Sequence, residues 1–110
     1  MSTIYSVEEL KTKIETREML VVYYSNETCN VCKVLKPKIR EMIEHQFPKS
    51  DFIYVDIEKS PVISGQFRVF SIPTVDIFIE GKELARFSRN ITMFDFEHAI
   101  KRPYELLFPE

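Results

Sequence analysis

Two cysteines, Cys29 and Cys32, are the only residues of their type in the chain, and two residues separate them in the stretch TCNVCK. A thiol pair at this spacing can exchange with disulfides. The thiolate of one cysteine attacks a disulfide sulfur to form a mixed disulfide, and the second cysteine then resolves it, so neither step needs a cofactor. Dithiol–disulfide exchange is the first hypothesis for this motif.

Two other interpretations of the pair remain open. A structural zinc site uses four protein ligands, and the histidines, His45 and His98, lie far from the cysteines in sequence. A zinc ion or an iron–sulfur cluster would therefore need the cysteine pairs of two copies. Both thiols could also be inert packing residues, because free cysteine is often a small buried apolar side chain. We expect no metal.

Length, composition and charge restrict the class of protein. The chain has 110 residues, with 15 Lys and Arg against 17 Asp and Glu, so residues 1–110 are expected to form a single domain without a basic surface for nucleic acid. No apolar run approaches the length that a membrane span requires, and the N-terminus MSTIYSVEEL lacks the pattern of a signal peptide. We expect a cytoplasmic protein that binds neither nucleic acid nor membrane. In a reducing compartment, a cysteine pair is more often catalytic than a permanent crosslink.

The elements around the motif give the two thiols different roles. Residues 19–25, MLVVYYS, are apolar and rich in β-branched and aromatic residues, which is typical of a buried strand. Apolar residues recur at helical spacing from Asn30 to Gln46. Cys29 therefore lies at a helix start, where unpaired N–H groups favour a thiolate nucleophile, and Cys32 lies one turn further in as the resolving thiol.

Four basic residues follow in the first half of this helix: Lys33, Lys36, Lys38 and Arg40. Nearby cations favour a thiolate, but exposed lysines act weakly through water. We interpret Lys33 as a contributor to the thiolate and the other three as a solvated helix face.

The rest of the chain predicts a mixed sheet with helices on both faces. Ser6 and Glu9 have the spacing of a capping box for a helix through Thr16. A strand at residues 51–57 and a short helix from Ser60 to about residue 67 or 69 follow. Residues 80–82 would turn a hairpin between strands at 74–79 and 83–88, and Thr92 would cap a last helix. Pro37 should bend the cysteine-bearing helix, and Pro103 should end or kink the last one.

Together these features resemble the thioredoxin family: an apolar strand running into C-x-x-C, Lys33 directly after it, Pro37 five residues beyond Cys32, and an Ile-Pro-Thr segment at residues 72–74. The resemblance implies a thioredoxin-like α/β fold, with a mixed central β-sheet flanked by helices on both faces. It also implies that Pro73 follows a cis peptide bond and that Ile72 presents its backbone to the substrate chain. Implied partners are disulfide-containing proteins and an electron donor such as a thioredoxin-reductase-type enzyme.

The chain departs from the family pattern at three places. Thr28 replaces the tryptophan before the first cysteine, and Asn30-Val31 replaces Gly-Pro between the two. Tyr23 stands where the family has a buried carboxylate, which implies slower deprotonation of Cys32. Arg89 or Asn90 stands where a glycine usually borders the substrate groove, which would narrow the groove and favour acidic partners.

The competing hypothesis is a thioredoxin fold without catalysis. Such a module would bind a partner protein and use Cys29 and Cys32 as a redox sensor, or not use them at all. Enzymatic turnover distinguishes the two classes.

Overall fold

The computed structural model describes residues 2–109. Five strands form one sheet in the order β1-β3-β2-β4-β5, in which β1, β2 and β3 are parallel and β4 and β5 run antiparallel to their neighbours. The strands are β1 (Ser2–Thr3), β2 (Met19–Ser25), β3 (Asp51–Asp56), β4 (Thr74–Ile79) and β5 (Lys82–Ser88), and the helices are α1 (Val7–Thr16), α2 (Asn30–Gln46), α3 (Pro61–Gln66) and α4 (Met93–Leu107). The predicted α/β fold with a mixed sheet is confirmed.

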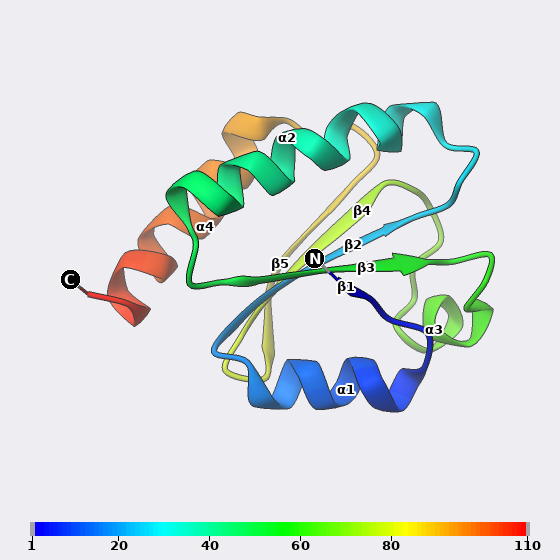
Figure 1. Ribbon diagram of the computed structural model, residues 1–110, viewed down its shortest axis with the longest axis horizontal. Helices are drawn as coiled ribbons and strands as arrows, with labels where there is room; N and C mark the ends of the chain where they lie inside the picture. Colours follow the sequence, from blue (N-terminus) through cyan, green and yellow to red (C-terminus); the bar gives the residue numbers. More distant parts are fainter. Residues whose placement is uncertain (1, 110) are drawn as a thin grey trace.

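Helices cover both faces of the sheet (Figure 1). Helices α1 and α3 lie on one side, and α2 and α4 lie together on the other. Strand β2 is central and all seven of its residues are buried, which explains its continuous apolar sequence. Alternate β2 residues enter two separate cores, so that Tyr23 packs toward α2 and α4 while Tyr24 packs toward α1 and α3.

The first helix forms as its sequence predicts. The Ser6 hydroxyl accepts a hydrogen bond from the Glu9 N–H, and the Glu9 carboxylate accepts one from the Tyr5 N–H. Apolar side chains spaced three and four residues apart, Val7, Leu10 and Ile14, are buried on one face.

Pro103 does not end the last helix, so that alternative of the prediction is wrong. Proline cannot donate the hydrogen bond that would join it to the preceding turn, yet α4 continues to Leu107. Packing on both sides of the proline maintains the helix: Phe96 and Ile100 are fully buried before it, and the Tyr104 ring packs edge-on against Phe47 after it, with ring centroids 5.2 Å apart. Helix α2 likewise continues through Pro37.

The hairpin between β4 and β5 is tighter than predicted. Only Glu80 and Gly81 form the turn, with φ of 47° and 87°, because two left-handed residues match the twist of the paired strands. Lys82 already pairs with Ile79, and the register shifts between Ile77 and Phe78. Strand β3 ends one residue earlier than predicted, and the two-residue strand β1 was too short for its sequence to indicate.

A buried ion pair joins β4, β5 and the segment after α3. Asp76 is fully buried, and its carboxylate accepts two hydrogen bonds of 2.8 Å from the Arg86 guanidinium. The same guanidinium donates to the carbonyl oxygens of Phe67 and Arg68, at 2.8 and 2.9 Å. Burial raises the pKa of Asp76 to about 6 although the Arg86 hydrogen bonds act to lower it. Arg86 thereby fixes the segment that leads to Pro73 against the sheet.

Candidate functional site

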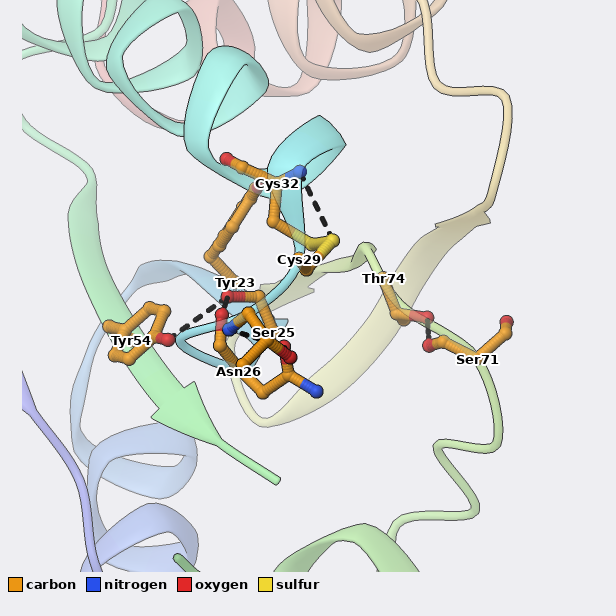
Figure 2. Close-up of a disulfide and its surroundings, with 9 residues drawn as sticks. Tyr23, Ser25, Asn26, Cys29, Cys32, Tyr54, Ser71 and Thr74 are labelled. Carbon is orange, nitrogen blue, oxygen red and sulfur yellow. Dashed lines mark hydrogen bonds between the residues drawn. A yellow bond between two sulfur atoms is a disulfide. The ribbon is translucent and has the colours of Figure 1, made fainter. Parts of the chain in front are cut away.

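The two cysteines lie where β2 passes into α2, and they form a disulfide with Cα atoms 5.2 Å apart (Figure 2). Cys29 is the N-cap of α2, and its sulfur accepts a hydrogen bond of 3.2 Å from the Cys32 N–H. Cys29 is partly exposed, whereas Cys32 is 1% exposed. The sulfur of Cys29 is therefore the one that a disulfide of another protein can reach.

Cys29 occupies a position at the helix start that favours a negative charge. The first N–H groups of an α-helix have no partner within the helix, and their partial positive charge stabilises an anion. The short N–H···S contact places the Cys29 sulfur in that position. Lys33 is exposed on the next turn, so its charge acts through water and adds less than the backbone does.

Pro73 directly precedes β4, whose first residue, Thr74, pairs with Tyr24 of β2. The Ile72–Pro73 peptide bond is cis, as expected. The Pro73 carbonyl accepts a hydrogen bond of 3.0 Å from the Arg89 N–H, and the Thr74 hydroxyl donates one of 2.7 Å to the Ser71 carbonyl (Figure 2). Within residues 2–109, no hydrogen bond involves the N–H or C=O of Ile72.

Arg89, and not Asn90, occupies the conformation that favours glycine. Its φ is 65°, in the left-handed region that non-glycine residues adopt only at a cost. With Val31, Val34 and Ile91, Arg89 lines a groove of about 320 Å³ next to α2. Val31 and Val34 are 62% and 60% exposed, so the lining is largely apolar, and it carries two cations, Lys38 and Arg89.

Tyr23 lies directly below Cys32 and is fully buried. Its hydroxyl donates a hydrogen bond of 2.8 Å to the Cys32 carbonyl. Burial raises the pKa of Tyr23 well above its usual value, and the neighbouring Tyr54 adds to the effect. The side chain is therefore a neutral donor that supports the helix start, and it cannot replace a carboxylate as a base.

A pocket of about 360 Å³ opens on the Cys32 side of the site, and Cys32, Lys36, Tyr54 and Ser25 are part of its lining. The Tyr54 and Ser25 hydroxyls are hydrogen-bonded at 3.0 Å (Figure 2). The ammonium of Lys36 lies 4.0 Å from the centroid of the Tyr54 ring, which is a cation–π contact. Burial lowers the pKa of Lys36, and the nearby Arg40 adds to the shift.

The interpretation of Lys36 as part of a solvated helix face is therefore wrong. The side chain is partly buried because Tyr54 provides an aromatic surface beneath it. The four-residue spacing between Cys32 and Lys36 places both on one helix face. This spacing was the feature of the sequence from which the position of Lys36 near Cys32 could have been predicted. Tyr54 could not be found from the sequence, since its partners come from β2 and α2.

In the part of the chain that the structure describes, the two histidines do not form a metal-binding group with the cysteines. His45 and His98 are exposed on different helices, and the His98 ring stacks on Phe94. Among residues 2–109, no group of three or more His, Cys, Asp or Glu side chains is arranged to hold a metal ion. Asp56, the last residue of β3, is 4% exposed, and its carboxylate accepts hydrogen bonds from the N–H groups of Glu58 and Lys59.

No helix within residues 2–109 is long and apolar enough to cross a membrane.

Comparison with known proteins agrees with this geometry. The thioredoxin family model matches residues 2–102. A thioredoxin-like protein of Bacillus subtilis, YdfQ, is 27% identical over 106 residues, covering 96% of this chain and 94% of the relative. Thioredoxin of Chlamydia trachomatis is 34% identical over 86 residues, covering 78% and 82% of the two chains.

Solved structures show the same fold. Mitochondrial thioredoxin 3 of Saccharomyces cerevisiae, in its oxidised form, superposes with a TM-score of 0.83 at 22% identity, covering 92% of this chain and 93% of that one. The family match, the relatives and the disulfide-bonded C-x-x-C pair lead to one conclusion. The chain belongs to the thioredoxin family of dithiol–disulfide oxidoreductases.

Proposed function

We propose that the protein reduces disulfides of other proteins, with Cys29 as the nucleophile and Cys32 as the resolving thiol. The Cys29 thiolate attacks one sulfur of a substrate disulfide, forming a mixed disulfide and releasing the other sulfur as a thiolate. The Cys32 thiolate then attacks the Cys29 sulfur, which releases the second substrate thiolate and forms the Cys29–Cys32 disulfide. Two electrons pass to the substrate, and its two thiolates take up protons.

One observation supports this assignment above all. Cys29 is partly exposed at the start of α2, whereas Cys32 is buried behind it. Since only a reachable thiolate can attack an external disulfide, the order of the two steps follows from the two exposures. Catalysed reduction of insulin by dithiothreitol, compared between the wild type and variants of each cysteine, tests the proposal.

The backbone of Ile72 is proposed to bind the substrate chain next to Pro73. Its N–H and C=O are without hydrogen-bond partners inside the described chain, and Ile72 and Cys29 pack against the same apolar core. An extended peptide can pair with such groups by main-chain hydrogen bonds, whatever its sequence. This mode suits an enzyme whose substrates share a disulfide and little else.

Continued turnover needs a donor that reduces the Cys29–Cys32 disulfide again. We propose a thioredoxin-reductase-type enzyme as this donor, and the cytoplasm as the compartment, because catalytic thiol pairs are typical of reducing surroundings. The family-wide chemistry of dithiol exchange supports such a donor.

The groove lined by Val31, Val34 and Arg89 is proposed to select acidic substrates. Its lining is apolar apart from two cations, Lys38 and Arg89. Replacing Arg89 by glycine, which suits the left-handed conformation, removes the charge without straining the backbone. We expect the preference for an acidic over a basic disulfide peptide to fall about threefold, the effect of one exposed charge.

The measurement is kcat/KM for two peptides that differ only in the charges flanking the disulfide. Lys11→Met, on α1 across the sheet, is the control, and it should leave the preference unchanged. If the wild type has equal kcat/KM values for the two peptides, Arg89 has no role in selecting substrates by charge.

A further inference from the structure

The second step of the proposed reaction needs a thiolate in an unfavourable place. Cys32 is 1% exposed, and burial raises the pKa of a thiol because the charged form loses its hydration. The Tyr23 hydroxyl contacts Cys32, but it already donates its hydrogen bond to the Cys32 carbonyl. Another group must compensate for the burial of the anion.

The pocket on the Cys32 side holds the candidate groups. Besides Cys32, its ionisable lining residues are Glu27, Lys33, Lys36 and Tyr54. Glu27 forms a salt bridge of 2.7 Å with Lys59 on the exposed rim, and Lys33 is exposed. Both are screened by water.

Lys36 differs from these rim groups in two respects. It follows Cys32 by four residues on α2, so the two side chains leave the same helix face one turn apart. It is also partly buried, because its ammonium rests 4.0 Å from the centroid of the Tyr54 ring. A partly buried cation is screened less than an exposed one and acts more strongly on a neighbouring charge.

Tyr54 is itself held in place. Its hydroxyl is hydrogen-bonded to Ser25 at 3.0 Å, and its ring stacks on that of Tyr23 with centroids 6.4 Å apart. The aromatic surface under Lys36 is therefore rigid. Arg40, which follows Lys36 by four residues on α2, repels it and lowers its pKa further.

We propose that Lys36, held on the Tyr54 ring, supplies the positive charge that stabilises the Cys32 thiolate in the resolving step. This inference rests on the proposed function. Lys36 is a cation that stabilises the thiolate by its charge and takes no proton. The buried carboxylate of the family, which Tyr23 replaces here, is instead an anion that acts as a base. The same charge favours the reduced dithiol over the disulfide, since only the reduced form contains the anion.

The pKa of Cys32 tests this directly. In a Cys29→Ser background, where Cys32 is the only thiol, the rate of alkylation against pH gives its midpoint. Adding Lys36→Met should raise the midpoint by about one unit, the usual effect of losing an opposite charge at close range. Lys36→Arg should keep the wild-type midpoint, because arginine retains the charge.

Lys49→Met is the matched control. Lys49 also lies over an aromatic ring, 5.9 Å from the centroid of Phe108, and it is not among the residues lining the Cys32 pocket. Its loss removes the same charge and the same kind of contact. The Cys32 midpoint should not move.

The resolving step gives a second readout in the protein with both cysteines. Reaction of the reduced protein with a chromogenic aromatic disulfide releases one thiol in each step, so stopped-flow traces show two phases. Below the midpoint, Lys36→Met should slow the second phase about threefold and leave the first unchanged. A rise of one pKa unit lowers the fraction of Cys32 present as thiolate about tenfold at a pH below the midpoint. The more basic thiolate is also a better nucleophile, so the rate falls only about threefold.

Each outcome has a distinct meaning. An unchanged midpoint in Lys36→Met, or an equal shift in Lys49→Met, would overturn the role of Lys36 and leave the proposed function intact. A Lys36→Arg variant that behaves like Lys36→Met would also overturn it, since the amine would then be acting as a base. The proposed function itself predicts that the wild type shows a second phase and that Cys32→Ser abolishes it. If the wild type shows no such phase, the proposed function is refuted.

Discussion

The Cys29→Ser variant should lose all catalysed reduction of insulin and proceed at the rate of dithiothreitol alone. A serine hydroxyl is not ionised at neutral pH and cannot attack a disulfide sulfur in place of a thiolate. Cys32 cannot take over the first step, because its side chain is buried behind Cys29. The measurement is the turbidity of precipitating insulin chains against time, with the wild type as reference.

The Cys32→Ser variant should also lose turnover, but for a different reason. Its Cys29 still attacks the substrate, and the mixed disulfide then accumulates because no second thiol resolves it. When the pre-reduced protein is mixed with insulin in the absence of dithiothreitol, which would itself cleave the mixed disulfide, mass spectrometry should find one substrate chain bound per protein in this variant and none in Cys29→Ser. A wild type that is no faster than dithiothreitol alone would favour the non-enzymatic interaction module.

The Arg86→Met variant should lose about 3 kcal/mol of unfolding free energy. Removing one partner of a buried ion pair leaves an uncompensated charge, which costs about 3–5 kcal/mol. The lower end applies because the Arg86 side chain is 27% exposed, while Asp76 is fully buried. The carbonyl oxygens of Phe67 and Arg68 lose their donors as well. Urea unfolding measures the loss.

The loss in Arg86→Met should be smaller at about pH 5 than at about pH 8. Burial already raises the pKa of Asp76 to about 6, and removing the guanidinium raises it further. A carboxyl whose folded pKa exceeds its unfolded value binds its proton more tightly in the native state. Its contribution to stability is therefore complete in acid and is lost as the pH rises through the folded pKa.

Arg17→Met is the matched control for this ion pair. Arg17 forms a salt bridge of the same 2.8 Å length with Asp51, but both side chains are more than 40% exposed. Its loss should cost less than about 1 kcal/mol. Equal losses in the two variants would show that Arg86 contributes no more than a surface contact.

The catalytic motif could be predicted from sequence because its geometry is local. The strand before Cys29 and the helix after it are each recognisable from a few residues, and the N-cap position fixes which sulfur is exposed. The cis bond before Pro73 followed from resemblance to the family.

The surroundings of the motif could not be predicted in the same way. Tyr54, Ser25 and Lys36 come from three elements and meet only after β3 has paired with β2. The pairing of Asp76 with Arg86 depends on the β4–β5 register, which shifts between Ile77 and Phe78. A one-residue change of register would place these side chains on opposite faces.

The ionisation of the Cys29 thiol is the measurement that tests the central claim most directly. The reduced protein is alkylated over a range of pH, and the modified cysteine is identified by peptide mass spectrometry. We expect Cys29 to react first, with a midpoint well below about 8.5, the value of an unperturbed thiol. The account is contradicted if both thiols remain protonated beyond that pH, or if Cys32 reacts before Cys29.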